Sequence, residues 1–271
     1  MDVPFPRKVA ALDGVVATSV ACGDSHSCVV DDEGRLYTWG WNGSQISGFG
    51  LLGHGDKEKQ VLTPKLVRSL EDSGARVASA SCGECHTAIM TDDGEVLSCG
   101  SGEHGLNGNA SSGDVLAPEP VSELDHEHVV QLEAGSAFTV ARCKDGDVYL
   151  WGRNDQGQLG TGGGFAMDVY AMEDLPRLVE QNDGSPLKAR HIAAGHSYRL
   201  TQSGATASLS LSLSRYISHQ SLDGYIYIRH VALATPENEL YFWGMRAHLE
   251  PYKVRLFSRS LRRECVRVGD D

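Results

Sequence analysis

The sequence has no apolar run that approaches the roughly 18–20 residues needed to cross a bilayer. Its first residues, Met1 to Pro6, have neither the basic start nor the apolar stretch of a secretory signal. Basic residues are outnumbered, 24 against 36 acidic ones, so the formal net charge is −12. Neutralising DNA phosphates requires clustered Lys and Arg. We therefore expect a chain of the cytoplasm, the nucleus or both, without a membrane anchor and without direct DNA contacts.

Aromatic residues are also scarce, at 7%, and only seven cysteines occur. Without a secretory context, these cysteines indicate reduced thiols rather than a disulfide framework. Glycine, in contrast, is abundant, with 31 of the 271 residues. Because glycine is costly inside helices, this excess favours short strands joined by tight turns.

A short segment recurs along the chain and establishes an internal repeat. Clear copies stand at Ala21–Ser27 and Ser81–Thr87, with weaker copies at 134–139 and 194–198. Each of the first three copies is followed by a turn and a strand-like run that ends in glycine. These glycines are Gly40, Gly100 and Gly152, spaced 60 and 52 residues apart, and a fourth equivalent is Gly244.

Each unit is predicted to contain four short antiparallel strands. In the first unit they are expected near Val15–Ala21, Ser27–Asp31, Arg35–Trp39 and Lys65–Val67, with Asp-Gly, Glu-Gly or Asn-Gly turns in the units. A sheet of this size cannot bury both of its faces alone. Packing such units side by side into a propeller buries them.

Several motifs together resemble the regulator of chromosome condensation repeat. They are Cys22-Gly23-Asp24-Ser25-His26, the run from Trp151 to Gly160, and Pro64-x-x-Val67. The resemblance implies an all-β fold, a β-propeller of that family's type. Four recognisable units imply an incomplete arc of about four antiparallel four-stranded blades within a single region, 1–271. The repeats are predicted at about 13–67, 73–124, 127–180 and 188–256.

The fourth repeat is interrupted at about 198–229. This stretch includes a Ser-Leu alternation at 208–214, which is of low complexity. Two interpretations stay open: a loop insertion, or a retained intron whose pyrimidine-rich codons would give such a run. We favour the second as a hypothesis.

No motif indicates covalent catalysis or a bound cofactor. Cys82-Gly83-Glu84-Cys85-His86 has the spacing for haem attachment, but the first repeat carries the same segment with one cysteine missing. A zinc site has no second Cys/His pair at a suitable spacing. The sequence contains no G-x-S-x-G or H-E-x-x-H motif. We therefore expect no cofactor, no metal and a non-enzymatic protein.

The resemblance implies binding to a protein partner. The family's founding member is a guanine nucleotide exchange factor for the small GTPase Ran and uses acidic and histidine residues on one propeller face. One contact segment of that factor is similar to Gly23-Asp24-Ser25-His26, so Asp24 is the acid that the resemblance carries over. In the second unit the family's acid directly precedes the histidine, where this chain has Cys85, and Glu84 stands one position earlier. The candidate partner-binding residues are therefore Asp24, Glu84, His26 and His86. For the two histidines, a hydrogen-bonded structural role is the alternative, and we favour it.

Two other functions of the family serve as comparisons. One is a binding scaffold without exchange activity, such as an adaptor of the ubiquitin pathway or of chromatin. The other is the ultraviolet-B photoreceptor, which uses clustered tryptophans in Gly-Trp-Arg-His-Thr segments. None of the four tryptophans here lies in such a segment, so we disfavour a photoreceptor.

Overall fold

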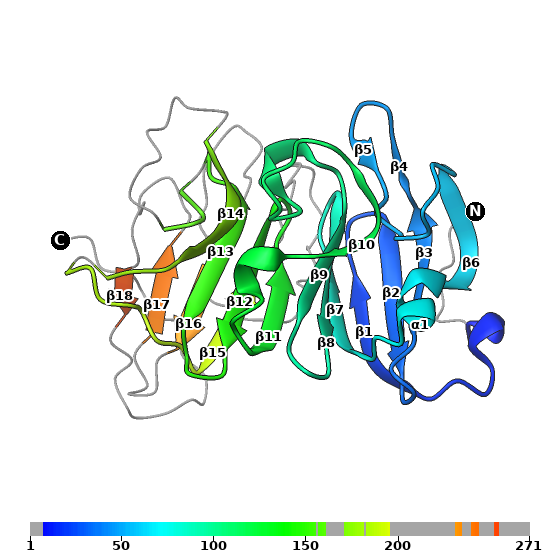
Figure 1. Cartoon of the computed structure of the whole chain (residues 1–271), viewed down its shortest axis with the longest axis horizontal. Helices are drawn as coiled ribbons and strands as arrows, with labels where there is room; N and C mark the ends of the chain where they lie inside the picture. Colours follow the sequence, from blue (N-terminus) through cyan, green and yellow to red (C-terminus); the bar gives the residue numbers. More distant parts are fainter. Residues whose placement is uncertain are drawn as a thin grey trace, which may run out of the picture.

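A computed structural model describes residues 8–155, 157–160, 171–181 and 183–195, and the backbone of three further strands at 231–234, 240–243 and 252–254. These residues form four separate four-stranded antiparallel sheets that lie side by side in chain order (Figure 1). We call them blades 1 to 4. Within each blade the strands follow one another in sequence, so every blade is a simple meander.

The strands of blade 1 are β1 (Ala17–Cys22), β2 (His26–Asp31), β3 (Leu36–Trp41) and β6 (Gln60–Leu66). Those of blade 2 are β7 (Val77–Cys82), β8 (His86–Thr91), β9 (Val96–Gly100) and β10 (Val115–Pro120). Those of blade 3 are β11 (Val129–Ala134), β12 (Phe138–Cys143), β13 (Val148–Arg153) and β14 (Met172–Leu178). Those of blade 4 are β15 (His191–Ala194), β16 (Val231–Ala234), β17 (Leu240–Trp243) and β18 (Tyr252–Val254).

The remaining elements are short and lie in connections. They are the 3-10 turns η1 (Ala10–Leu12), η2 (Glu103–Gly105) and η3 (Ser122–Leu124), the helix α1 (Arg68–Ser73), and a two-stranded hairpin, β4 (Gly43–Ser44) with β5 (Gly48–Phe49). None of the helices among the described residues is long and apolar enough to cross a membrane.

The fourth strand of blade 1 begins earlier than the sequence pattern predicts. β6 starts at Gln60, and a register shift lets Gln60 and Val61 pair with the end of β3. The fourth strands of the first three blades contain proline, for example Pro64 in β6 and Pro176 in β14. Because proline cannot donate a ladder hydrogen bond, it suits an edge strand and hinders further strand addition there.

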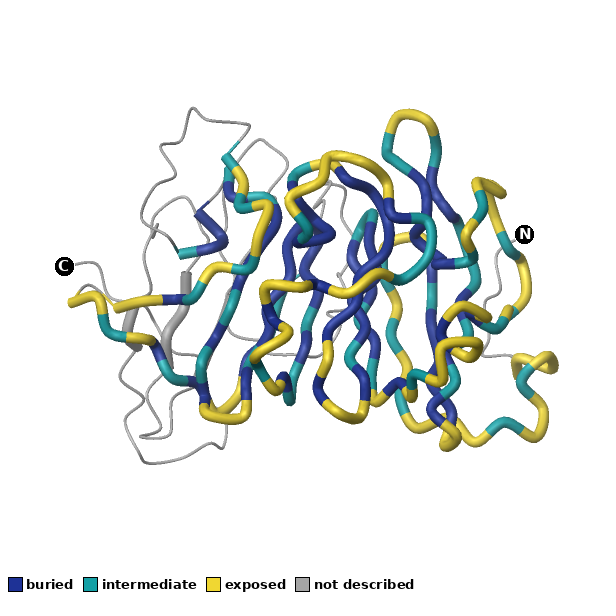
Figure 2. The backbone as a smooth tube through the Cα atoms, viewed as in Figure 1, coloured by how far each residue is buried: buried dark blue, intermediate teal, exposed yellow. Residues whose placement is uncertain are grey.

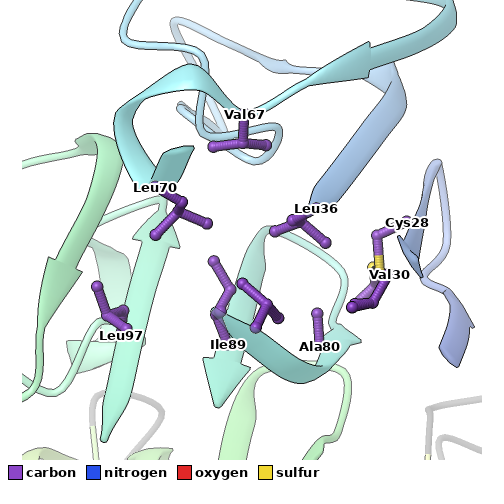
Figure 3. Close-up of a cluster of buried hydrophobic side chains, with 10 residues drawn as sticks. Cys28, Val30, Leu36, Val67, Leu70, Ala80, Ile89 and Leu97 are labelled. Carbon is purple, nitrogen blue, oxygen red and sulfur yellow. Dashed lines mark hydrogen bonds between the residues drawn. The ribbon is translucent and has the colours of Figure 1, made fainter. Parts of the chain in front are cut away.

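The hydrophobic cores lie between the blades rather than within them. Cys28, Val30 and Leu36 of blade 1 pack against Ile89 and Leu97 of blade 2 (Figure 3). Equivalent clusters join blade 2 to blade 3 and join blade 3 to the segment that begins blade 4. The dark blue, buried parts of the chain in Figure 2 accordingly run along the strands that face a neighbouring blade. The apolar faces that meet at these three junctions are thus buried by the neighbouring repeat.

Backbone hydrogen bonds repeat at every junction between blades. The amide of Val77, which begins β7, donates to the carbonyl oxygen of Gly34 in the β2–β3 turn, at 2.8 Å. The same bond joins Val129 to Gly94 at 3.1 Å, and the amide of Ala189 donates to Gly146 at 2.7 Å. A regular junction of this kind sets each blade in the same relation to the one before it.

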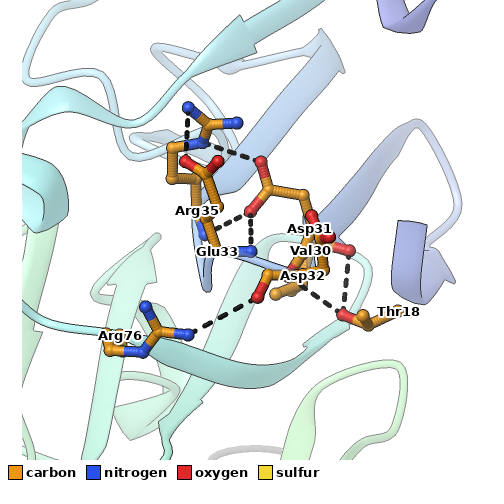
Figure 4. A network of polar contacts seen from close by, with 7 residues as sticks. All are labelled: Thr18, Val30, Asp31, Asp32, Glu33, Arg35 and Arg76. Carbon is orange, nitrogen blue, oxygen red and sulfur yellow. Dashed lines mark hydrogen bonds and ion pairs between the residues drawn. The ribbon is translucent and has the colours of Figure 1, made fainter. Parts of the chain in front are cut away.

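A polar network fixes the β2–β3 turn of blade 1 (Figure 4). One oxygen of the buried Asp31 carboxylate accepts from the amides of Glu33 and Arg35, and the other accepts from Arg35 Nε at 2.7 Å. Burial alone would raise the pKa of Asp31, but these hydrogen bonds and the Arg35 charge hold it below its ordinary value. Arg76, at the start of blade 2, donates to the Asp32 carbonyl at 3.5 Å.

One face of blade 1 has no neighbouring blade among the described residues. Val20 on β1 is 68% exposed, whereas Ala80, at the equivalent position of β7, is 7% exposed because blade 1 packs on it. Leu62 on β6 is also strongly exposed. The same repeat position is therefore exposed in blade 1 and buried in blade 2.

In blade 4, β15 pairs directly with β16, with Ala194 opposite Val231. This pairing joins the two sides of the segment predicted to interrupt the repeat, 198–229, which itself lies outside the described residues.

The glycines at or next to the ends of the third strands leave no room for a side chain. Gly100 has φ +128°, and a Cβ built on it would lie 2.5 Å from the Cys85 carbonyl oxygen. That carbonyl accepts the Ser101 amide at 2.8 Å and so cannot move freely.

We expect Gly100→Ala to destabilise the protein by more than about 2 kcal/mol, because the new methyl group meets backbone atoms in a strained conformation. Gly74, at the end of α1, is a matched control: it also has positive φ, but a Cβ built on it would meet nothing within 4 Å. Gly74→Ala should therefore cost only about 1 kcal/mol. Urea unfolding of both variants measures the difference, and equal losses would contradict the close-contact explanation.

A second prediction concerns pH. Burial, and then the charge of Lys65, lower the pKa of His54 from 6.5 to about 4. The unfolded chain therefore binds more protons than the folded chain between these values, and stability should fall as the pH drops from about 6.5 towards 4. His54→Gln removes this contribution, so its unfolding midpoint should lose less on acidification than that of the natural chain. An identical acid loss in both proteins would show that His54 is not responsible.

Candidate functional site

The predicted acidic residues lie on loops at one end of the blades. Asp24 sits between β1 and β2, and Glu84 sits between β7 and β8. The same backbone bonds hold both loops: Gly23 and Gly83 each donate to the carbonyl of the histidine three residues later, at 2.9 Å. The residue after each of the glycines Gly40 and Gly100 donates to the same loop, as Ser101 does to Cys85. The repeat therefore presents Asp24 and Glu84 at equivalent positions.

The two predicted histidines point away from this surface. His26 and His86 are buried, and each forms a hydrogen bond with a threonine of the following blade. His26 Nε2 lies 2.8 Å from Thr87 Oγ1, and His86 Nε2 lies 2.9 Å from Thr139 Oγ1. The imidazoles thus connect neighbouring blades. The third equivalent by sequence, His230, lies outside the described residues.

A hydroxyl beside an imidazole can indicate a catalytic nucleophile and its base, so the direction of this bond matters. Thr87 Oγ1 donates its proton to the Leu51 carbonyl at 2.6 Å, which leaves it only as an acceptor towards His26. His26 Nε2 must then carry the proton and cannot act as the base. Thr87 is also fully buried, so the pair is suited to joining blades and not to attacking a substrate.

Glu84 is bound to the next blade while remaining half-buried. Its Oε2 accepts from Ser136 Oγ at 2.7 Å, and its amide donates to the Ser136 carbonyl at 2.8 Å. Asp24, in contrast, is exposed. The two acids therefore differ: Asp24 belongs to the surface of blade 1, and Glu84 also bridges blades 2 and 3.

A third acid, Glu103, lies close enough to Cys85 to affect the pKa of its thiol. Burial first, and then the charges of Glu84, Glu103 and Asp24, raise its pKa to about 12. We call the surface formed by Asp24, Glu84 and Glu103 the acidic face. Sequence reasoning missed Glu103, which begins η2. The available signal was its repeat position, because Asp155 stands equally far from the strand-ending glycine in blade 3.

The β4–β5 hairpin projects at the same end of the molecule (Figure 1). It occupies the loop of blade 1 that the sequence shows to be longer than its counterparts. Ile46 at its tip is 89% exposed. The hairpin is anchored to blade 2, because the Asp114 carboxylate accepts the Phe49 amide at 2.9 Å and the Gly102 amide at 3.3 Å. A single exposed apolar side chain is common on protein surfaces, so Ile46 shows that the hairpin tip is accessible and does not by itself mark a binding site.

Within the described part of the chain, no group of three or more His, Cys, Asp or Glu residues could hold a metal ion. The surface is a set of loops with carboxylates and one apolar tip.

Four-stranded meanders packed side by side, with variable loops gathered at one end, define the chain as a propeller-type repeat protein. It belongs to the family of the regulator of chromosome condensation (RCC1) repeat. Models of this repeat match residues 33–90, 93–142 and 145–200, and also 17–45, 77–106 and 129–158.

Three curated relatives illustrate the family. The human E3 ubiquitin-protein ligase HERC2 is 36% identical over 208 residues, which are 75% of this chain and 4% of HERC2. The ultraviolet-B receptor UVR8 of Arabidopsis thaliana is 29% identical over 262 residues, 90% of this chain and 56% of UVR8. The mitochondrial RCC1 domain-containing protein RUG3 of the same plant is 32% identical over 195 residues, 72% of this chain and 42% of RUG3. The chain thus spans a small part to about half of these relatives.

Solved structures show the same fold. Human WBSCR16 matches with a TM-score of 0.62 at 19% identity, over 89% of this chain and 53% of that one. Prp20p of Saccharomyces cerevisiae matches with a TM-score of 0.61 at 17% identity, over 90% of this chain and 51% of that one. The all-β, RCC1-like propeller fold predicted from the sequence is therefore confirmed.

The hydrogen bonds between blades yield a prediction. Thr87→Val leaves His26 Nε2 and the Leu51 carbonyl without their bond in a buried place, which should cost about 1–3 kcal/mol for each group. Ser27 is the matched control, because it stands at the same repeat position on the uncovered face of blade 1. Ser27→Ala should change stability by less than about 0.5 kcal/mol. Chemical unfolding compares the two, and a silent Thr87→Val would refute the role given to this bond.

Proposed function

We propose that this chain is a non-enzymatic protein-binding propeller region that contacts a protein partner through its acidic face and the β4–β5 hairpin. The observation that carries the proposal is the gathering of Asp24, Glu84 and Glu103 around Cys85, at the end from which the hairpin projects. Loops held by a rigid scaffold are the usual place for binding residues. A carboxylate cluster favours a partner with a basic surface.

The histidines enter the proposal in a different way from the acids. His26 and His86 are buried, so they support the site by fixing each blade to the next. Asp24 and Glu84 are the residues available for partner contact. Their separation depends on the junction between blades 1 and 2, which the bond between His26 and Thr87 stabilises.

The finer proposal is that the partner is a small Ran-like GTPase and that binding promotes release of its guanine nucleotide. A carboxylate placed near the nucleotide pocket would compete electrostatically with the phosphates or pair with basic residues that hold them. Prp20p has binding properties to Gsp1p and histones, which makes a GTPase a sensible first partner to test. The alternative is a scaffold without exchange activity, and HERC2, named as a ubiquitin ligase, makes a ubiquitin-pathway adaptor its first candidate.

The proposal also concerns photoreception and the location of the protein in the cell. We do not propose photoreception, because the sequence lacks the Gly-Trp-Arg-His-Thr segments. We propose the cytoplasm or the nucleus as the location, although RUG3 is a mitochondrial relative, and we propose no contact with DNA.

The test uses charge reversal at the acidic face. Asp24→Lys should weaken partner binding at least about tenfold, because the interface then contains a repulsive or unpaired charge. The melting temperature should stay nearly unchanged because Asp24 is exposed. Glu123, exposed on η3 at the other end of the blades, is the matched control. Binding to nucleotide-free GTPase and release of a fluorescent nucleotide are measured side by side.

The outcomes separate the alternatives. Faster nucleotide release that is lost in Asp24→Lys and kept in Glu123→Lys supports exchange. Binding that is equal for nucleotide-free and nucleotide-bound GTPase, with no effect on release, favours the scaffold. Equal losses in both variants would reject the acidic face as the binding surface. If Asp24→Lys lowers stability and leaves release unchanged, the residue only stabilises its loop.

A further inference from the structure

Two cysteines from neighbouring blades are in contact. Cys28 on β2 of blade 1 and Cys82 on β7 of blade 2 place their sulfur atoms 3.5 Å apart. Both side chains belong to the hydrophobic cluster of Figure 3, and each residue is 2% exposed. They are 54 positions apart in the sequence, so their contact depends on the packing of one blade against the next.

The two thiols are not equivalent. Cys82 donates its proton to the sulfur of Cys28, and this bond lowers the pKa of Cys28 below its ordinary value while it raises that of Cys82. Burial works against ionisation at both, and the backbone of Ala21 gives Cys28 a second, smaller stabilisation. Because the thiolate is the reactive form, Cys28 is the better nucleophile of the pair. Cys82 lies in position to react with the oxidised form of Cys28.

We propose that Cys28 and Cys82 are a peroxide-reactive pair that forms a disulfide linking blade 1 to blade 2. The Cys28 thiolate attacks one oxygen of hydrogen peroxide, so that an S–O bond forms, the O–O bond breaks and hydroxide leaves, which becomes water with the proton that the Cys28 thiol released. The Cys82 sulfur then attacks the sulfur of the Cys28 sulfenic acid, so that an S–S bond forms, the S–O bond breaks and a second hydroxide leaves, which becomes water with the proton of the Cys82 thiol. In total, two thiols lose two electrons and two protons, and the peroxide is reduced to two water molecules.

The other thiols in the described part of the chain have different surroundings. Cys22 is exposed near Ser27. The thiol of Cys99 is directed at the Leu51 carbonyl, 3.9 Å away, and burial raises its pKa to about 12. Burial also raises the pKa of Cys85 and of Cys143 to about 12. Among these residues, the contact between two sulfur atoms belongs to Cys28 and Cys82.

The cross-link would act at the base of the acidic face. Cys82 is two residues before Glu84, and Cys28 is four residues after Asp24. A disulfide there would fix the junction that sets the distance between these two acids. It would also close a long loop of the unfolded chain, which raises the stability of the folded state.

Peptide mapping of the whole chain tests the proposal directly. The native protein is treated with hydrogen peroxide, its remaining thiols are alkylated, and it is digested with a protease that cleaves after Asp and Glu. Cleavage at Asp24 separates Cys22 from Cys28, and cleavage at Glu84 separates Cys82 from Cys85. We expect a linked pair of the peptides Ser25–Asp31 and Ser73–Glu84, two hydrogen masses below their sum.

Stability provides the second readout. The melting temperature of the natural chain should rise after oxidation and return after reduction with dithiothreitol. Cys28→Ser and Cys82→Ser should each abolish this reversible rise, whereas Cys99→Ala, at a buried thiol of the same region, and Cys22→Ser should keep it. If a serine variant does not fold, the mapping of the natural chain still decides the question.

Three results would overturn the proposal. The first is the absence of the linked peptides at peroxide doses that already oxidise Cys22. The second is a disulfide that joins Cys22 or Cys85 instead. The third is an equal yield of the Cys28–Cys82 link in urea-unfolded protein, because the pairing would then not depend on the packing of the two blades.

Discussion

A four-stranded sheet of this protein has two faces, and one blade alone can bury neither of them. The three hydrophobic clusters accordingly lie between blades, where Leu36 of one repeat meets Ile89 of the next. The hydrogen bonds between blades depend on this packing of one repeat against the next. The regular amide bonds at the junctions, such as that of Val77 to Gly34, set the spacing at which the faces meet. The buried pair of His26 and Thr87 then adds a directional bond to a contact that is otherwise apolar.

One loop carries both the structural and the binding residues of a repeat. Between the first and second strands, the acid of the motif is directed to the surface and the histidine two positions later is directed into the next blade. Glu84 shows how closely the two roles are joined, because its carboxylate belongs to the acidic face and also accepts a hydrogen bond from Ser136 of blade 3. A partner that contacts Glu84 would therefore contact the junction between blades 2 and 3.

The repeat spacing predicted similar units, since the intervals between Gly40, Gly100 and Gly152 are alike, and the resemblance to the family's repeat motifs predicted the propeller fold. The sequence left two roles open for His26 and His86, contact with a partner or a structural hydrogen bond. A repeat alignment shows which residues are equivalent, but it does not show which residues of different units are in contact. The contact between Cys28 and Cys82 is hidden for the same reason: they occupy different strands of their units. Glu103 was missed because it lies outside the motif, on a loop that packing brings next to Cys85.

The uncovered face of blade 1 also has a kinetic consequence. Blade 2 is held on two sides, whereas the described contacts hold blade 1 from one side only, as the exposure of Val20 shows. In proteins built of stacked units, stability is close to a sum over units and their junctions. Local opening should therefore expose the amides of β1 to solvent exchange sooner than those of β7, although the two strands carry the same motif. Equivalent segments of a repeat protein can thus exchange their hydrogens at different rates, set by the number of neighbours each one has.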